Sequence, residues 1–173
     1  MLVIILTTAV IFLGVVVYYM YFIAPKLNPV NRAEILLQQN KVEEAIVELQ
    51  KVLDAAPYDI TTHKKLADLY QSQSKDELAA KHLERLTEIN RFNNDIVKGD
   101  IYRTLARMYL KKGQVDKSFE KYYELIKEFP TDSESLYHVG FITLGQELFE
   151  SAYKYLELLS RQEKNNYEIL FGA

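Results

Sequence analysis

The chain has 173 residues, room for one domain of ordinary size, with 21 basic and 24 acidic side chains and a net charge of −3. This balance gives no electrostatic reason to expect a nucleic-acid partner, because phosphate binding needs a concentrated basic surface. The absence of cysteine excludes disulfides and thiolate zinc sites. Glycine and proline are few, and Leu, Glu, Lys, Tyr and Ala dominate, so the composition predicts an all-α fold.

The first predicted element is an apolar helix over residues 2–23, a run of 22 residues without a charged side chain. As a helix this run would be about 33 Å long, enough for a hydrocarbon core of about 30 Å. Its C-terminal end carries aromatic residues typical of a membrane interface and a lysine that can snorkel: Tyr18, Tyr19, Tyr21, Phe22 and Lys26. We therefore predict that residues 1–25 form a transmembrane anchor, with residues 2–23 in contact with the lipid bilayer.

A cleaved signal peptide is the rival interpretation of this segment. The segment lacks a basic beginning and an A-x-A cleavage site, and its apolar run is long, so we prefer the uncleaved anchor. The basic residues after the span, Lys26, Arg32 and Lys41, favour a cytoplasmic C-terminal domain, while a periplasmic placement stays open. The expected protein is thus a single-pass protein of a bacterial-type inner membrane.

An internal repeat occupies the remainder of the chain, residues 26–173. The frame L-A-x-x-Y occurs over residues 66–70 and again over residues 105–109, 39 residues later. Small residues recur in the same register at intervals of 34, 39 and 34 residues: Ala45, Ala79, Ser118 and Ala152. The extra five residues fall in the polar segment 91–99, which we interpret as a surface loop.

Within one copy, the residues favour two helices joined by a tight turn. Apolar residues spaced by three and four place a hydrophobic stripe on each helix. Ala106 and Ser118 are small enough for the two helices to approach closely, and Gly113 is predicted to supply a left-handed turn between them. Pro130 ends the second helix, and a residue within 131–133 caps the next.

This order resembles the tetratricopeptide repeat, a 34-residue helix–turn–helix unit with small residues where its two helices touch. Four copies fit the chain, approximately over residues 29–58, 59–91, 99–131 and 132–165. The resemblance implies a right-handed α-solenoid in which stacked copies share one core. Residues 166–173 are predicted to begin a further helix, which indicates either a longer array, the interpretation we favour, or a helix that docks on a partner.

No motif for catalysis or metal binding is found. His63, His82 and His138 show no ligand spacing and are interpreted as ordinary solvated or half-buried histidines. The phosphate-binding glycine loops and the nucleophile elbow are likewise missing from the sequence. We therefore expect no enzyme activity, no cofactor and no metal site.

The family resemblance implies a concave groove lined by side chains of the first helix of each repeat. The positions that match the groove of the family are Lys64, Asp68, Arg103, Arg107, Tyr137 and Phe141. Cations beside exposed aromatic rings would suit an acidic or amphipathic segment of another protein, and a solvated face with incidental charges is the alternative. The asparagine clamp of chaperone-binding members is not reproduced, because Asp68 stands at the corresponding position.

Together these observations predict a membrane-anchored scaffold or adaptor that mediates protein–protein interactions and complex assembly. The alternative is a fixed subunit of a large, multi-subunit envelope machine, such as a flagellar motor or a secretion apparatus. In both cases the partners are proteins rather than nucleic acids.

Overall fold

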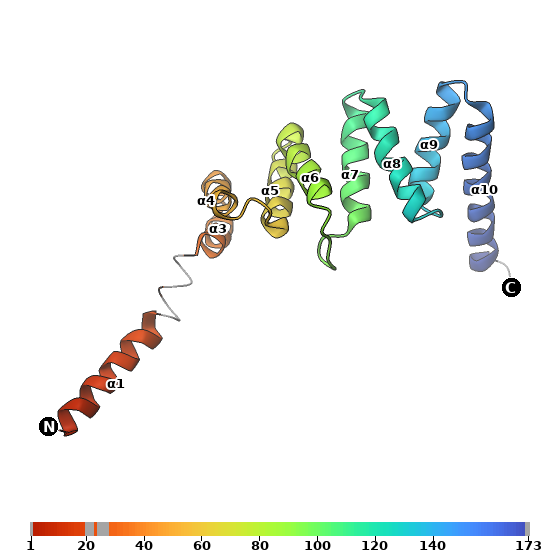
Figure 1. Cartoon of the computed structure of the whole chain (residues 1–173). Helices are drawn as coiled ribbons and strands as arrows, with labels where there is room; N and C mark the ends of the chain where they lie inside the picture. The colour runs from red at the N-terminus through yellow and green to blue at the C-terminus, as the bar shows by residue number, and fades with distance from the viewer. Residues whose placement is uncertain (1, 20–22, 24–27, 172–173) are drawn as a thin grey trace.

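The computed structural model describes residues 2–19, 23 and 28–171, and these residues are largely helical (Figure 1). The helices are α1 (Leu2–Tyr18), α3 (Pro29–Gln38), α4 (Val42–Ala55), α5 (Ile60–Ser72), α6 (Asp76–Ile89), α7 (Lys98–Lys111), α8 (Val115–Glu128), α9 (Ser133–Gly145) and α10 (Phe149–Phe171). The predicted all-α class is confirmed.

From α3 onward the helices form four hairpins that follow one another in a row: α3–α4, α5–α6, α7–α8 and α9–α10 (Figure 1). We call the first helix of each hairpin its A helix and the second its B helix. Every helix from α3 to α9 packs against the next helix in the chain. This nearest-neighbour arrangement is that of a helical solenoid, as predicted.

Small residues lie where the A and B helices of each hairpin touch. They are buried in all four hairpins and recur in register: Ala33 with Ala45, Ala67 with Ala79, Ala106 with Ser118, and Gly140 with Ala152. Because these residues have little or no side chain, the two helices approach closely and the larger apolar residues around them interlock. Ala106 and Ser118 are completely buried, as their predicted role at a close helix–helix contact requires.

Each turn from an A helix to its B helix contains one residue with a positive φ, at equivalent positions: Asn40, Ser74, Gly113 and Glu147. The N–H of the following residue donates to a carbonyl five residues earlier, for example from Gln114 to Tyr109 at 2.8 Å, which closes a Schellman motif. Gly113 adopts its φ of 72° without a steric penalty, as predicted, whereas a Cβ makes this conformation costly at the other three positions.

Side-chain caps begin three of the A helices. Asn28 accepts a hydrogen bond from the N–H of Val30 at 2.9 Å at the start of α3, and two aspartates cap α5 and α9 at equivalent positions. Asp59 accepts a hydrogen bond from the N–H of Thr62 at 2.8 Å, and Asp132 accepts one from the N–H of Ser135 at 3.0 Å. Each aspartate thus satisfies one of the backbone donors that a helix leaves unpaired at its start. The sequence predicts a cap within residues 131–133, and the structure shows that this cap is Asp132.

The extra residues between α6 and α7 form a compact turn. The side-chain oxygen of Asn93 accepts hydrogen bonds from the backbone N–H groups of Asp95 and Ile96 at 3.0 and 2.8 Å. Ile96 is only 3% exposed and joins the hydrophobic core. The segment is therefore anchored to the core. The sequence does not indicate this, because its apolar residues Phe92, Ile96 and Val97 show no helical or strand periodicity.

The structure contradicts the predicted single-pass membrane protein. Helix α1 has 17 residues, about 26 Å at 1.5 Å per residue, which is short of a hydrocarbon core of about 30 Å. Among the described residues, no helix combines the length and the apolar character that crossing a bilayer requires. The sequence predicts one helix over the whole apolar run 2–23, whereas the α-helix α1 is described over Leu2–Tyr18.

Of the five residues predicted to lie at a membrane interface, the structure describes two. Tyr18 ends α1 and Tyr19 follows it, and both are exposed. Tyr21, Phe22 and Lys26 lie outside the described residues. The predicted contact of residues 2–23 with lipid depended on the membrane span and is withdrawn with it.

The last helix also differs from its prediction. The sequence indicated a boundary near residue 165 and a new helix over 166–173, but α10 runs without a break from Phe149 to Phe171. Neither glycine nor proline occurs within this helix, and nothing else in its sequence stops it before Phe171. The polar residues around 165 are compatible with a helix and do not by themselves mark a turn.

The close packing of α9 on α10 makes Gly140 a test of the fold. A Cβ at this position would stand 2.6 Å from Cδ2 and 2.7 Å from Cγ of Leu156, so Gly140→Ala forces the two helices apart. We expect this change to lower the free energy of unfolding by about 1–3 kcal/mol, measured by urea denaturation. Gly145→Ala is the control, since nothing lies within 4 Å of its added Cβ, and an equal loss from both changes would contradict the packing argument.

Candidate protein-binding surface

The six predicted groove residues lie on three neighbouring A helices: Lys64 and Asp68 on α5, Arg103 and Arg107 on α7, and Tyr137 and Phe141 on α9. In each pair the residues are four apart and share one face of their helix. The pairs occupy equivalent repeat positions, because Lys64, Arg103 and Tyr137 are separated by 39 and 34 residues. What differs between the pairs is how much of each side chain remains available to a partner.

The pair on α5 is an ion pair within one helix. The amino group of Lys64 donates to both carboxylate oxygens of Asp68 at 2.7 Å. Its neighbour Lys65 reaches back to Glu34 on α3 at 2.6 Å, which links two A helices. The charges on this part of the surface therefore compensate one another inside the chain.

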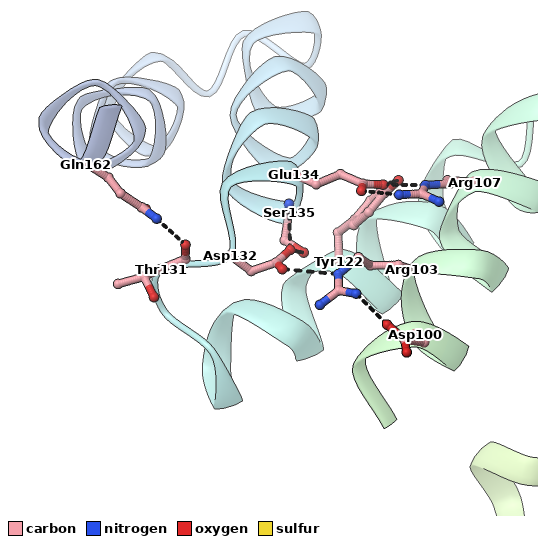
Figure 2. A network of polar contacts seen from close by, with 9 residues as sticks. All are labelled: Asp100, Arg103, Arg107, Tyr122, Thr131, Asp132, Glu134, Ser135 and Gln162. Atoms are coloured by element: carbon pink, nitrogen blue, oxygen red, sulfur yellow. Dashed lines mark hydrogen bonds and ion pairs between the residues drawn. The ribbon is translucent and has the colours of Figure 1, made fainter. Parts of the chain in front are cut away.

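Arg103 joins α7 to the start of α9, as Figure 2 shows. Its Nε lies 3.1 Å from Asp132, and its terminal nitrogen lies 2.8 Å from Asp100. Burial alone would raise the pKa of Asp132, but hydrogen bonds from Ser135 and the charge of Arg103 together lower it. One carboxylate thus caps α9 and holds an arginine of the preceding hairpin.

Arg107 makes a second link between the same two A helices. Its guanidinium group binds both oxygens of Glu134, with Nε at 2.6 Å from the first (Figure 2). Tyr122 on α8 donates its hydroxyl to the same carboxylate at 2.9 Å. The hydrogen bond from Arg107 is the main reason why the pKa of Glu134 is lowered against the opposing effect of burial. The network joins α7, α8 and α9 through one side chain.

The pair on α9 is aromatic and exposed. The rings of Tyr137 and Phe141 lie 4.5 Å apart, and the two residues are 46% and 49% exposed. Leu144, one turn further, is 41% exposed and extends the pair into an apolar stripe. The opposite face of α9 is also apolar, with Leu136 and Val139 fully buried. We call Tyr137, Phe141 and Leu144 the α9 stripe.

A further cluster lies inside the hairpin α5–α6, where His63 and His82 face each other with their Nδ1 atoms 3.0 Å apart. The ring of Tyr70 stacks on His82 at 5.6 Å. Burial, followed by the charges of His63 and Lys81, lowers the pKa of His82 to about 4. In the sequence the two histidines look isolated, because 19 residues separate them. Aligning α5 antiparallel with α6 about their small contact residues is the signal that could have placed them side by side.

Comparison with known proteins agrees with the repeat pattern. Models of the tetratricopeptide repeat match residues 30–59 and 104–132. The chain therefore contains tetratricopeptide repeats, as the sequence predicted, within an all-helical solenoid. No curated protein matches the sequence.

Solved structures with a similar fold include the crystal structure of YrrB, described as a TPR protein with an unusual peptide-binding site. It aligns with a TM-score of 0.60 and 17% identity over 79% of this chain and 68% of that chain. MamA AMB-1 aligns with a TM-score of 0.61 and 15% identity over 79% and 72% of the two chains. The MamA RS-1 ArsTM double mutant gives 0.59 and 15% over 86% and 80%. At these identities the likeness concerns the fold alone.

The network around Glu134 predicts that removing Glu134 and removing Arg107 lower the free energy of unfolding by different amounts. Glu134→Ala removes the acceptor of the buried Tyr122 hydroxyl, so we expect the free energy of unfolding to fall by about 1–3 kcal/mol. Arg107→Ala removes a largely exposed side chain and should cost less than about 1 kcal/mol. Urea denaturation of both variants gives the comparison. A larger loss from Arg107→Ala would contradict this assignment of the stabilising contact.

The histidine cluster predicts how stability depends on pH. Because the pKa of His82 is about 4 when folded and 6.5 ordinarily, the unfolded chain binds more protons between these values, and the free energy of unfolding falls on acidification. His82→Gln should flatten this decline between pH 6.5 and 5, measured by urea denaturation at several pH values. Burial also lowers the pKa of His138, so His138→Gln should remove a part of the decline as well. A wild-type slope in His82→Gln would refute the prediction.

Proposed function

We propose that the protein is an interaction scaffold that binds an amphipathic helical segment of another protein along the α9 stripe. The observation that carries this proposal is the apolar character of α9 on both of its faces. Its inner face packs on α8 and α10, while Tyr137, Phe141 and Leu144 stay exposed on the outer one. A helix that is hydrophobic all round normally has protein on all sides.

The geometry of the α9 stripe suits a helical partner. Its residues follow one another at intervals of four and three along one face of the helix. Such a row accepts the apolar face of a second helix laid along it, with partner side chains at spacings of three and four. Exposed aromatic side chains are also the residues that most often dominate binding energy in protein interfaces.

The charges beside the stripe argue against a partner that is mainly acidic. Three cations of this surface, Lys64, Arg103 and Arg107, are paired with four carboxylates: Asp68, Asp100, Asp132 and Glu134. These seven residues together carry one more negative than positive charge, and an acidic peptide would have to displace existing ion pairs. Of the two partner types that the sequence suggested, the amphipathic segment is the one we retain.

The likeness to known structures supports the class of function. YrrB is described as having a peptide-binding site, and it shares the helical solenoid fold with this chain. We carry over only this general capacity, because the identity of 17% gives no basis for transferring individual residues. The proposed site rests on the exposure and position of the α9 stripe.

Site-specific photo-crosslinking in the native cell tests the proposal. A benzophenone amino acid in place of Phe141 should form adducts with a defined protein partner, whereas the same group in place of Tyr58 should not. Tyr58 is a suitable control because it is aromatic and 64% exposed but lies between α4 and α5. Equal adduct formation at both positions would show that the α9 stripe has no preferred partner.

Binding measurements with the captured partner then separate apolar from electrostatic recognition. Phe141→Asp should weaken binding by roughly 30-fold, the effect of losing a central aromatic contact of about 2 kcal/mol. Affinity should change little between low and high salt, because the contact is apolar rather than ionic. A steep loss of affinity with salt, or unchanged binding of Phe141→Asp, would overturn the proposed mode of recognition.

A further inference from the structure

The histidine pair inside the second hairpin has a geometry that goes beyond packing. His63 lies on α5 and His82 on α6, and their rings are 5.2 Å apart between centroids at an interplanar angle of 47°. His63 is only 6% exposed, whereas His82 is half-buried. A cavity lined by both histidines and by Lys81, Glu84, Arg85 and Glu88 gives solvent access to the pair.

The hydrogen bonds determine which ring nitrogens carry protons. Nε2 of His63 lies 3.1 Å from the carbonyl oxygen of Pro57, which can only accept, so Nε2 carries the proton and donates. In neutral His63 the lone pair is therefore on Nδ1. That atom accepts from Nδ1 of His82 at 3.0 Å, so the proton between the two rings belongs to His82.

This arrangement has the features of a histidine that is ready to bind a metal ion. A ligating histidine typically donates its other ring N–H to a backbone carbonyl, which fixes the tautomer and orients the lone pair toward the metal. The contact from His63 to Pro57 is of this kind. His82 also has a free lone pair on Nδ1 once its proton moves from Nδ1 to Nε2 through solvent. This change leaves the number of bound protons unaltered.

The distance between the two nitrogens also suits a shared ion. Two imidazole nitrogens at about 2.0–2.1 Å from one zinc ion stand roughly 2.9–3.4 Å apart for angles between 90° and the tetrahedral value. The observed separation of 3.0 Å lies within this range. For both lone pairs to converge on the ion, each ring has to turn about its χ2 bond from its present position. We propose that His63 and His82 form a two-histidine chelate that binds a zinc-type divalent ion through both Nδ1 atoms.

The surroundings limit how strongly such an ion is held. Glu84 accepts the hydroxyl of Tyr109, and Glu88 is paired with Arg85, so both carboxylates of the cavity already have partners. Lys81 and Arg85 add positive charge nearby. Among the residues that the structure describes, no group of three candidate ligands is preformed. Water therefore completes the coordination, and imidazole ligands favour zinc, copper or nickel over calcium or magnesium.

Calorimetric titration of the full-length chain with Zn²⁺ alone, at pH 7.5, tests the proposal. We expect one ion per chain for the wild type. His63→Gln keeps a donor for the carbonyl of Pro57 but removes the ligand nitrogen, and it should weaken binding at least about tenfold, as should His82→Gln. His138→Gln is the matched control and should bind as the wild type does, because His138 lies on α9 away from the pair.

Nitrogen-15 spectra of the wild-type imidazoles give a readout that does not depend on how well the variants fold. On addition of Zn²⁺ the Nδ1 signals of His63 and His82 should both shift, and those of His138 should stay unchanged. The proposal is overturned by the absence of a one-to-one binding event, by shifts at Nε2 instead of Nδ1, or by an equal loss of affinity in His138→Gln. Calcium in place of zinc should leave all three histidines unaffected.

Discussion

The close contact between the two helices of each hairpin is the constraint on which the rest of this structure depends. Buried residues with little side chain recur in register on the two helices, such as Ala67 with Ala79 and Gly140 with Ala152, and Gly140 lies against Leu156. Because the helices approach closely, the Schellman turns that join them recur at equivalent residues, and larger side chains interlock above and below the contact. Successive hairpins can then stack on a continuous core, which leaves one face of each A helix available.

The features that the sequence predicts correctly are those that recur at fixed intervals or have a local physical cause. The small contact residues and the turn at Gly113 were predictable, because they recur at fixed intervals and have a local physical cause. The length of α1 and the continuity of α10 were not, because an apolar or polar composition does not mark where a helix ends. Spacing alone placed Arg103 and Arg107 on one face. Their acidic partners come from the next hairpin, whose orientation only the structure supplies.

These ion pairs change the role that we assign to the charged residues on the A helices. In the sequence, Arg103 and Arg107 suggest cations available to a partner; in the structure they fix the position of α9 against α7 through Asp132 and Glu134. An arginine that binds two carboxylate oxygens is geometrically restrained, so it specifies the register between hairpins even where an exposed pair contributes little free energy. The surface that we propose for recognition is then apolar, which shifts the expected source of affinity from charge to the burial of aromatic side chains.

The α9 stripe and the histidine pair lie in different hairpins, and this separation has an energetic consequence. In a solenoid each repeat contacts only its neighbours, so stability is close to a sum of repeat and interface contributions. An ion held by His63 and His82 would act first on the contact between α5 and α6. It could reach α9 only through the third hairpin, which contacts α9 through the packing of α8 and through the Arg103 and Arg107 networks. Because the effect would have to cross each of these interfaces in turn, occupation of one site should leave the affinity of the other nearly unchanged.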